Sequence, residues 1–290
     1  FFKELILKDL KNVFISRVSD KMLNCTDNLI ISGFIGVGTV GRYANYSMIT
    51  QAIINILTIL ANTIQPTIGD YFTEKNYRRN YEILRQLTFV FFCISSVVAA
   101  GLFSLITPFI CDIWLSPAYE LGWGTAVLCI VVLLIKIMGL PLSLMMGVTG
   151  LFEKEKNAGA SSAILNLVVS LALVRPYGMT GVLLGTLLSY LLQICYRYVI
   201  FFRDFLEMKE EAIRYARDLG EYTAVMILEV AVTRRIIPLI YGNGGMTPFI
   251  SCFVLCILVP LALNGVFFGR GWRLQSIVKM VRGMKRSGSR

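Results

Sequence analysis

The chain has 290 residues, of which 56% are hydrophobic and 16% are charged, and its mean hydropathy is +0.68. Soluble globular domains carry about 25% charged residues, so this composition excludes that class and predicts a polytopic membrane protein. The formal net charge is +10. We expect no nucleic-acid partner, because nearly all of the basic residues fall in alternate loops, as membrane topology requires.

The sequence offers no residue set for a metal, a cofactor or a covalent catalyst. It has no histidine, and its seven cysteines are scattered through apolar runs without a CxxC pair. It also lacks the Walker and GxSxG sequences of nucleotide-driven pumps and serine hydrolases. We therefore expect no cofactor, no metal and no enzymatic activity.

Apolar stretches of about twenty residues, the length that crosses a bilayer, predict about eight transmembrane helices. We place them at 13–34, 43–68, 87–106, 121–148, 158–174, 180–202, 221–241 and 248–268. Lys and Arg cluster in every second loop and in the tail, so both ends of the segment are expected to be cytoplasmic, in a bacterial inner membrane. The first residue is Phe1, and we expect the chain to be part of a longer polypeptide.

The first predicted span carries polar and charged residues inside its apolar stretch. Four of them recur every three or four residues and share one side of a helix, within roughly 80°. They are Arg17, Asp20, Asn24 and Asp27, with Lys21 and Asn28 beside them. Charges at membrane depth are costly unless they face protein or water, so this stripe predicts one wall of a polar cavity.

Two roles are open for the charges of this span. Asp27 is the candidate for coupling to a proton or sodium ion, or it forms a structural ion pair with a helix outside this sequence. Arg17 and Lys21 lie near the expected cytoplasmic end, where they either contact a phosphate or extend to the interface.

The second predicted span carries a row of amides and a hydroxyl, again within roughly 80° of one helical face. The row is Gln51, Asn55, Thr58, Asn62 and Gln65. Uncharged amides that donate and accept hydrogen bonds suit a hydroxyl-rich ligand such as a sugar. The alternative is hydrogen bonding between packed helices.

Other ionisable residues interrupt later spans. Lys136 lies in the fourth span, and Arg234 and Arg235 accompany Glu229 in the seventh. They are interpreted either as phosphate contacts or as lipid-headgroup anchors, and nearness to an interface favours anchoring. Between the sixth and seventh spans, Phe205, Met208 and Tyr215 belong to an apolar face at helical spacing, which predicts an amphipathic surface helix.

The stretch CTDNLIISGFIGVGTVGRYANYSMI, residues 25–49, resembles the seventh and eighth helices of bacterial O-antigen and capsular repeat-unit flippases, the polysaccharide transport family. The positions that fit are Thr26, Asp27, Asn28, Ile30, Ile31, Ser32, Phe34, Gly36, Val40, Gly41, Tyr43, Asn45 and Tyr46. IWLSPAYEL, residues 113–121, is similar to the family's outer loop, with Ser116 where glycine is usual. VTGLFEKEK, residues 148–156, is also similar, with Val148 and Thr149 in place of the customary alanine region.

The resemblance implies an all-α integral membrane fold, the C-terminal lobe of a MATE-like fourteen-helix transporter. Its implied parts are a cytoplasmic lead-in 1–12, a six-helix lobe 13–202, a cytoplasmic amphipathic loop 203–220, two additional transmembrane helices 221–268 and a basic cytoplasmic tail 269–290.

The function implied by the resemblance is flipping of undecaprenyl-diphosphate-linked oligosaccharide repeat units by alternating access. The implied partners are the lipid-linked oligosaccharide, membrane lipids, a proton or sodium as coupling ion, and polysaccharide polymerase machinery. The alternative within the superfamily is a cation-coupled multidrug exporter of the MATE type. A polysaccharide polymerase would need large outer loops, and the outer loops here are short and nearly uncharged.

Overall fold

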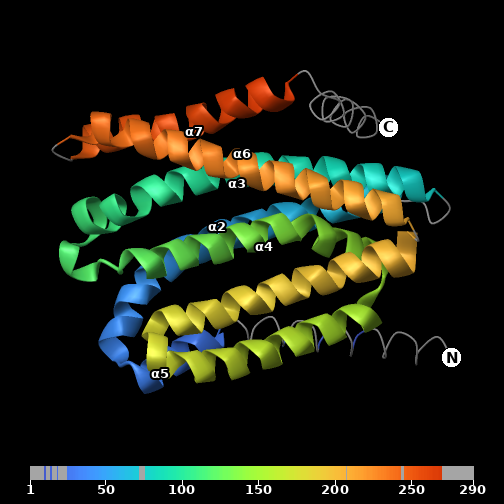
Figure 1. The fold of residues 1–290 in the computed structure, drawn as a ribbon, viewed down its shortest axis with the longest axis horizontal. Coiled ribbons are helices and arrows are strands. Elements are labelled where there is room, and N and C mark those ends of the chain that lie inside the picture. Colours follow the sequence, from blue (N-terminus) through green and yellow to red (C-terminus); the bar gives the residue numbers. More distant parts are fainter. Residues whose placement is uncertain are drawn as a thin grey trace. The chain divides into compact units, whose positions relative to one another are not determined.

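The structure is a computed structural model that describes residues 25–71, 76–206, 208–242 and 245–269, together with residues 10, 14 and 18. The elements in these residues are all helical (Figure 1). They are α2 Val37–Tyr71, α3 Tyr77–Pro108, η1 Phe109–Trp114, η2 Pro117–Tyr119, α4 Trp123–Thr149, α5 Phe152–Val199, η3 Ile200–Leu206, α6 Lys209–Tyr241 and α7 Met246–Phe268. The all-α prediction is confirmed.

Within the described residues, five helical stretches are long and apolar enough to cross a membrane. They are Val37–Asp70, Tyr77–Trp114, Trp123–Thr149, Asn157–Leu206 and Met246–Phe268. The chain is a multi-pass membrane protein. Residues 25–34 are also helical and end the first predicted span, whereas most of the lead-in 1–12 and nearly all of the tail 269–290 lie outside the described residues.

Helix α5 contains two of the predicted spans and is broken between them at Gly178. The φ of Gly178 is 56° and its ψ is −136°, a backbone conformation that side chains other than glycine rarely adopt. The two halves of α5 pack closely after this break. The close approach is seen at Gly185, where a Cβ atom would collide with the side chain of Ser170. With this break, the helical segments agree with the prediction of about eight membrane helices.

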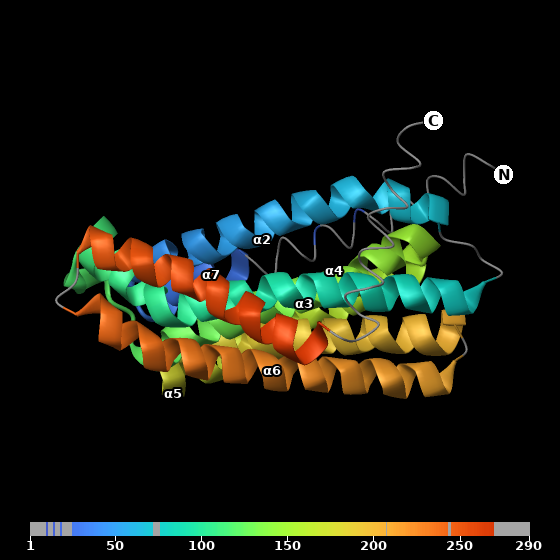
Figure 2. The same cartoon turned by 90° about the horizontal axis from the view of Figure 1, so that it is seen from above.

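The chain divides into two compact units. Unit 1 comprises Phe1–Phe72 and Ser116–Lys209, and unit 2 comprises Thr73–Leu115 and Glu210–Arg290. In unit 1, α4 packs against both α2 and α5. In unit 2, α3 packs against α7, and α6 runs alongside α3 in both views (Figures 1 and 2).

Helix α6 is continuous through the stretch predicted as an amphipathic loop and through the seventh predicted span. Its buried residues recur every three or four positions, so they form one stripe along the helix. The stripe is Tyr215, Asp218, Tyr222, Met226, Glu229, Thr233 and Ile237. The ring of Tyr222 stacks on Phe92 of α3 at 4.5 Å between centroids, which fixes α6 against α3.

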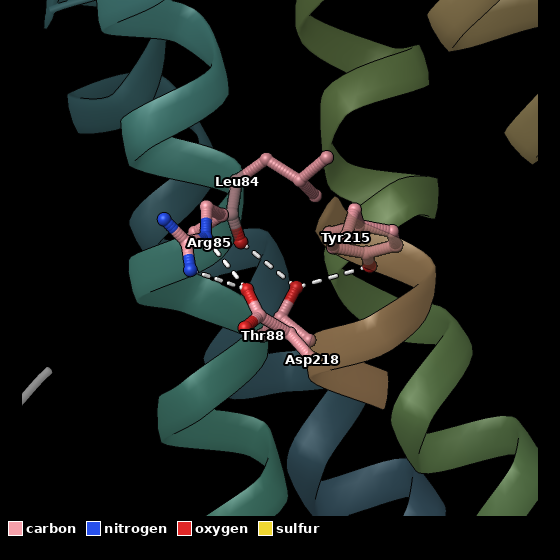
Figure 3. Close-up of polar contacts among 5 residues, drawn as sticks. All are labelled: Leu84, Arg85, Thr88, Tyr215 and Asp218. Carbon is pink, nitrogen blue, oxygen red and sulfur yellow. Dashed lines mark hydrogen bonds and ion pairs between the residues drawn. The ribbon is translucent and has the colours of Figure 1, made fainter. Parts of the chain in front are cut away.

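Polar contacts also join α3 and α6 within unit 2 (Figure 3). An Arg85 Nη2 atom lies 2.6 Å from Asp218 Oδ2, and the Thr88 hydroxyl lies 3.1 Å from the Tyr215 hydroxyl. Thr88 also hydrogen-bonds the carbonyl oxygen of Leu84 at 2.8 Å. Arg85 and Asp218 are largely buried, so this pair is part of the packing between the two helices.

Candidate functional site

Unit 1 contains a polar cavity with a volume of about 50 Å³. Its walls come from the helical stretch 25–34, from α2, from α4 and from the second half of α5. A water molecule needs roughly 10–15 Å³ of such space, so the cavity accommodates a few waters or a small ion but no sugar ring. The polar groups at its wall include Asp27, Tyr43, Gln51, Lys136 and Thr186.

Asp27 is the most constrained polar residue of this cavity. Only 3% of it is exposed. The Thr186 hydroxyl lies 2.9 Å from both carboxylate oxygens and donates to them, and Asn166 Nδ2 donates to the Thr186 oxygen at 2.9 Å. Asp27, Asn166 and Thr186 come from three different helical segments, because Asn166 and Thr186 lie on opposite sides of the break at Gly178.

Further oxygen atoms lie around Thr186, the residue that donates to Asp27. Ser170 donates its hydroxyl to the carbonyl oxygen of Val182 at 3.2 Å, and Thr186 lies 3.3 Å from the same carbonyl. The Asn166 Oδ1 atom is buried and has no hydrogen-bond partner among the described residues. Carboxylate, hydroxyl, amide and carbonyl oxygens are the ligands that hard cations prefer.

Lys136 brings a positive charge to this cavity. Its side chain lines the same cavity, interacts electrostatically with Asp27, and places Nζ 4.5 Å from the ring centroid of Tyr190. Lys136 is thirteen residues from either end of α4. A headgroup anchor would lie near a helix end, so the interpretation of Lys136 as an anchor is wrong: it faces the cavity.

The structure places the predicted stripe of the first span only in part. Asp27 faces the cavity, whereas Asn28 is exposed. Arg17, Asp20, Lys21 and Asn24 lie outside the described residues.

The amide row of the second span is distributed over different surroundings. Gln51 lines the cavity and donates from Nε2 to Asn55 Oδ1 at 2.9 Å. Thr58 donates to the backbone carbonyl of Ile54 at 2.7 Å, in its own helix. Asn55 and Asn62 are exposed. Gln65 lies against α4, where a Cβ on Gly147 would be 2.6 Å from its Nε2 atom.

Sequence reasoning missed Asn166, Thr186 and Tyr43 as members of the site, and it assigned Lys136 a different role. Lys136 carries a clear signal, a lone cation within an apolar span. Asn166 and Thr186 carry a weaker one, because single amides and hydroxyls are common in membrane helices. Only the folding of α5 back at Gly178 brings these two side chains to Asp27.

Two ion pairs tie the ends of the α5 hairpin in unit 1. Arg197 Nη2 lies 2.7 Å from Glu155 Oε1, and both side chains are nearly buried. Lys154 Nζ lies 2.6 Å from Asp204 Oδ2. Lys154 and Glu155 lie in the first turn of α5, Arg197 lies in the last turn of α5, and Asp204 lies in η3, so these pairs hold the two halves of the hairpin together.

No family model matches the chain, and no curated protein sequence matches it. Among solved structures, the chain is similar to the membrane transporter class of lipid flippases. The matched structure is the lipid II flippase MurJ in an inward closed conformation, with a TM-score of 0.64 and 14% sequence identity. The match covers 92% of this chain and 54% of that one, so this chain spans about half of the length of the solved protein. The match shows that the two chains share a fold.

Proposed function

We propose that this chain forms the C-terminal lobe of a flippase that moves lipid-linked oligosaccharide repeat units across the bacterial inner membrane. The fold supports the proposal, because the solved protein that shares it is a lipid II flippase. The resemblance of residues 25–49 to repeat-unit flippases favours an undecaprenyl-diphosphate-linked O-antigen or capsular unit as substrate. No covalent bond changes in this reaction.

The observation that carries the mechanism is the size and chemistry of the cavity at Asp27. About 50 Å³ is too small for a sugar, so the cavity serves the driving ion and not the substrate. A buried carboxylate is costly in the apolar membrane interior unless a cation compensates it. A proton or sodium ion at Asp27 provides this compensation and couples transport to an ion gradient.

Cation binding at Asp27 has a direct structural consequence. Its oxygen ligands would come from the stretch 25–34 and from both halves of α5, through Asp27, Asn166 and Thr186. A cation therefore draws three helical segments together, and its release lets them separate. A ligand that binds one arrangement better than another shifts the population toward it, as alternating access requires.

The oligosaccharide is expected to pass along the polar surface of unit 1 and not through the cavity. Asn55 and Asn62 are exposed on α2 and present uncharged amides suited to sugar hydroxyls. Arg17 and Lys21 are proposed to contact the diphosphate at the cytoplasmic end of the same path. The lipid tail stays in the bilayer, and both ends of this segment are proposed to lie in the cytoplasm. Polysaccharide polymerase machinery is a further proposed partner.

The test uses the full-length transporter that contains this chain, in a strain deleted for it. Asp27→Asn should leave the protein in the membrane at wild-type abundance and abolish surface polysaccharide. Asp70→Asn is the matched control, because Asp70 is an exposed aspartate on α2. Normal polysaccharide with Asp27→Asn would overturn the coupling role of Asp27.

The same deletion strain separates the proposal from the multidrug exporter. A flippase deletion should lose surface polysaccharide with unchanged drug sensitivity. Increased drug sensitivity with intact polysaccharide would favour the exporter. Flipping measured in vesicles with opposed sodium and pH gradients then identifies the coupling ion.

A further inference from the structure

Unit 2 contains a second buried polar cluster, formed by one side chain from each of three helices. Glu229 of α6 and Ser96 of α3 have no exposed surface, and Asn264 of α7 is 6% exposed. Asn264 Nδ2 donates to Ser96 Oγ at 2.9 Å, and the Ser96 hydroxyl donates to the carbonyl oxygen of Cys93 at 3.0 Å. The Glu229 carboxyl adjoins Ser96.

Glu229 differs from other buried carboxylates because neither of its oxygens has a hydrogen-bond partner among the described residues. It is 20 residues from the start of α6 and 12 from its end, or about 30 Å and 18 Å along the axis. An ionised carboxylate at this depth, without donors, would cost several kcal/mol. The carboxyl therefore has to be neutral or has to bind a cation.

Among the described residues, no ion pair to Glu229 is formed, and the two arginines that follow it on α6, Arg234 and Arg235, are exposed while Glu229 is buried. From α3, the titratable group that faces it is the thiol of Cys93, and α7 contributes the Asn264 amide. The Cys256 thiol of α7 points to the carbonyl oxygen of Ala100. On α6 itself, Thr233 donates to the Glu229 backbone carbonyl, and Asp218 is paired with Arg85.

The hydrogen-bond inventory distinguishes a neutral acid from a carboxylate. Ser96 has one hydroxyl proton, and the Cys93 carbonyl at 3.0 Å and the adjoining Glu229 carboxyl compete for it. Asn264 Oδ1 is a second buried acceptor without a partner in the described residues. An ionised Glu229 would add only acceptors to this cluster, which already has more acceptors than donors. A protonated Glu229 adds the O–H donor that the cluster lacks.

We propose that Glu229, Ser96 and Asn264 form a second protonation site, in which Glu229 carries a proton that it exchanges during transport. The proposal rests on the proposed transport function. Its ligand is the proton, bound covalently to a Glu229 oxygen and donated in a hydrogen bond to Ser96 or Asn264. Release requires water or another acceptor to reach Glu229, so exchange occurs only when α6 or α7 moves away from α3.

The first measurement is infrared difference spectroscopy of the purified full-length protein, titrated with acid and base without substrate. The spectra are recorded in the Asp27→Asn background, because Asp27 is itself a proposed cation site. This protein should show the carbonyl band of a protonated carboxylic acid, and adding Glu229→Gln should remove the band. Glu221→Gln, at an exposed glutamate of the same helix, should keep it. Ser96→Ala should move the band, because the acid loses an acceptor. In the Asp27→Asn background, a band that survives Glu229→Gln, or a spectrum altered by sodium instead of pH, would overturn the assignment.

The second measurement is the pH dependence of flipping in reconstituted vesicles. Glu229→Gln keeps the shape of the side chain and its neutral state, so a purely structural role predicts unchanged transport. Proton exchange predicts that the pH-dependent part of the rate is lost, and Glu229→Asp should restore some of it. If the wild type flips no lipid-linked oligosaccharide, the proposed function fails, while the infrared band still decides whether Glu229 binds a proton.

Discussion

The two units hold their buried carboxylates in different ways. In unit 1, Asp27 accepts from Thr186, adjoins a cavity with room for water or an ion, and interacts with Lys136. In unit 2, Glu229 has no hydrogen-bond partner among the described residues and lies beside Ser96. The first environment suits a charged group that exchanges ions, and the second suits a neutral acid. Burial alone therefore does not define the role of an acidic residue.

Unit 2 also contains a third kind of buried carboxylate, one that is held in an ion pair. Asp218 pairs with Arg85 at 2.6 Å between α6 and α3 (Figure 3). An ion pair of this kind cannot exchange its partner without separating the helices. We expect Arg85–Asp218 to matter for stability, Asp27 for ion coupling, and Glu229 for proton exchange.

The largest expected effect on stability is that of Arg85→Ala. The substitution leaves the Asp218 carboxylate, 9% exposed, without its ion-pair partner, and breaking such a pair costs about 3 kcal/mol or more. The measurement is the unfolding midpoint of the purified protein in detergent. Arg78→Ala is the control, because Arg78 and Glu82 form a mostly exposed pair worth at most about 0.5 kcal/mol. Equal effects of the two substitutions would contradict a structural role for Arg85.

The next effect concerns cation binding in unit 1. Thr186→Val removes the hydroxyl that donates to Asp27 and keeps the shape of the side chain. The Thr186 oxygen is a proposed cation ligand, so sodium affinity should fall on the order of 10-fold to 100-fold. Proton affinity should instead rise, because the Asp27 carboxylate loses a donor that stabilises its charged form. Titration calorimetry with sodium or protons measures both affinities.

The matched control for Thr186→Val is Thr180→Val. Thr180 lies in the same half of α5, and its hydroxyl is 3.2 Å from that of Thr125, away from the charged group. This control should leave cation affinity unchanged. A loss of affinity in both variants would indicate a general disturbance of α5 and not a site at Asp27.

Lys136→Gln should change cation affinity in the opposite direction. Lys136 is a fixed positive charge that competes with the coupling cation for Asp27, so its removal should tighten cation binding by about tenfold, equivalent to about 1.4 kcal/mol. Tighter binding slows release, and flipping should become slower at high cation concentration. Weaker binding in Lys136→Gln would show that Lys136 orders the site and does not compete for it.

The sequence predicted the membrane fold well, since about eight apolar stretches and their separating turns follow from composition and span length alone. It also predicted that Asp27 is the critical charge of the first span, and the structure buries Asp27 at a cavity. Whether Asp27 couples an ion stays a prediction. The role of Lys136 was missed because span boundaries, taken from hydropathy, give no information on which side chain faces inward.

Contacts across a helix break were beyond prediction for a physical reason. Asn166 and Thr186 are 20 residues apart and meet only because the backbone reverses at Gly178. Ser96 and Asn264, which form a hydrogen bond between α3 and α7, are 168 positions apart in the sequence. A stripe on one helix can be read from spacing, but its partner depends on packing between helices, which spacing does not encode.

The smallest expected effect tests the separation of the ion site from the substrate path. Asn55→Ala and Asn62→Ala each remove an exposed amide of α2, and a neutral hydrogen bond contributes about 1 kcal/mol, so each should raise the substrate concentration needed for half-maximal flipping roughly fivefold. Cation affinity should stay unchanged, because neither residue lines the cavity at Asp27.

Ser251→Ala is the control for both substitutions. The Ser251 hydroxyl is exposed on α7 and hydrogen-bonds within its own helix, so the substitution should change neither the substrate concentration for half-maximal flipping nor the cation affinity. A change in cation affinity with Asn62→Ala would contradict the separation of the ion site from the substrate path. Unchanged flipping in both asparagine variants would indicate that the amide row serves helix packing instead of substrate binding.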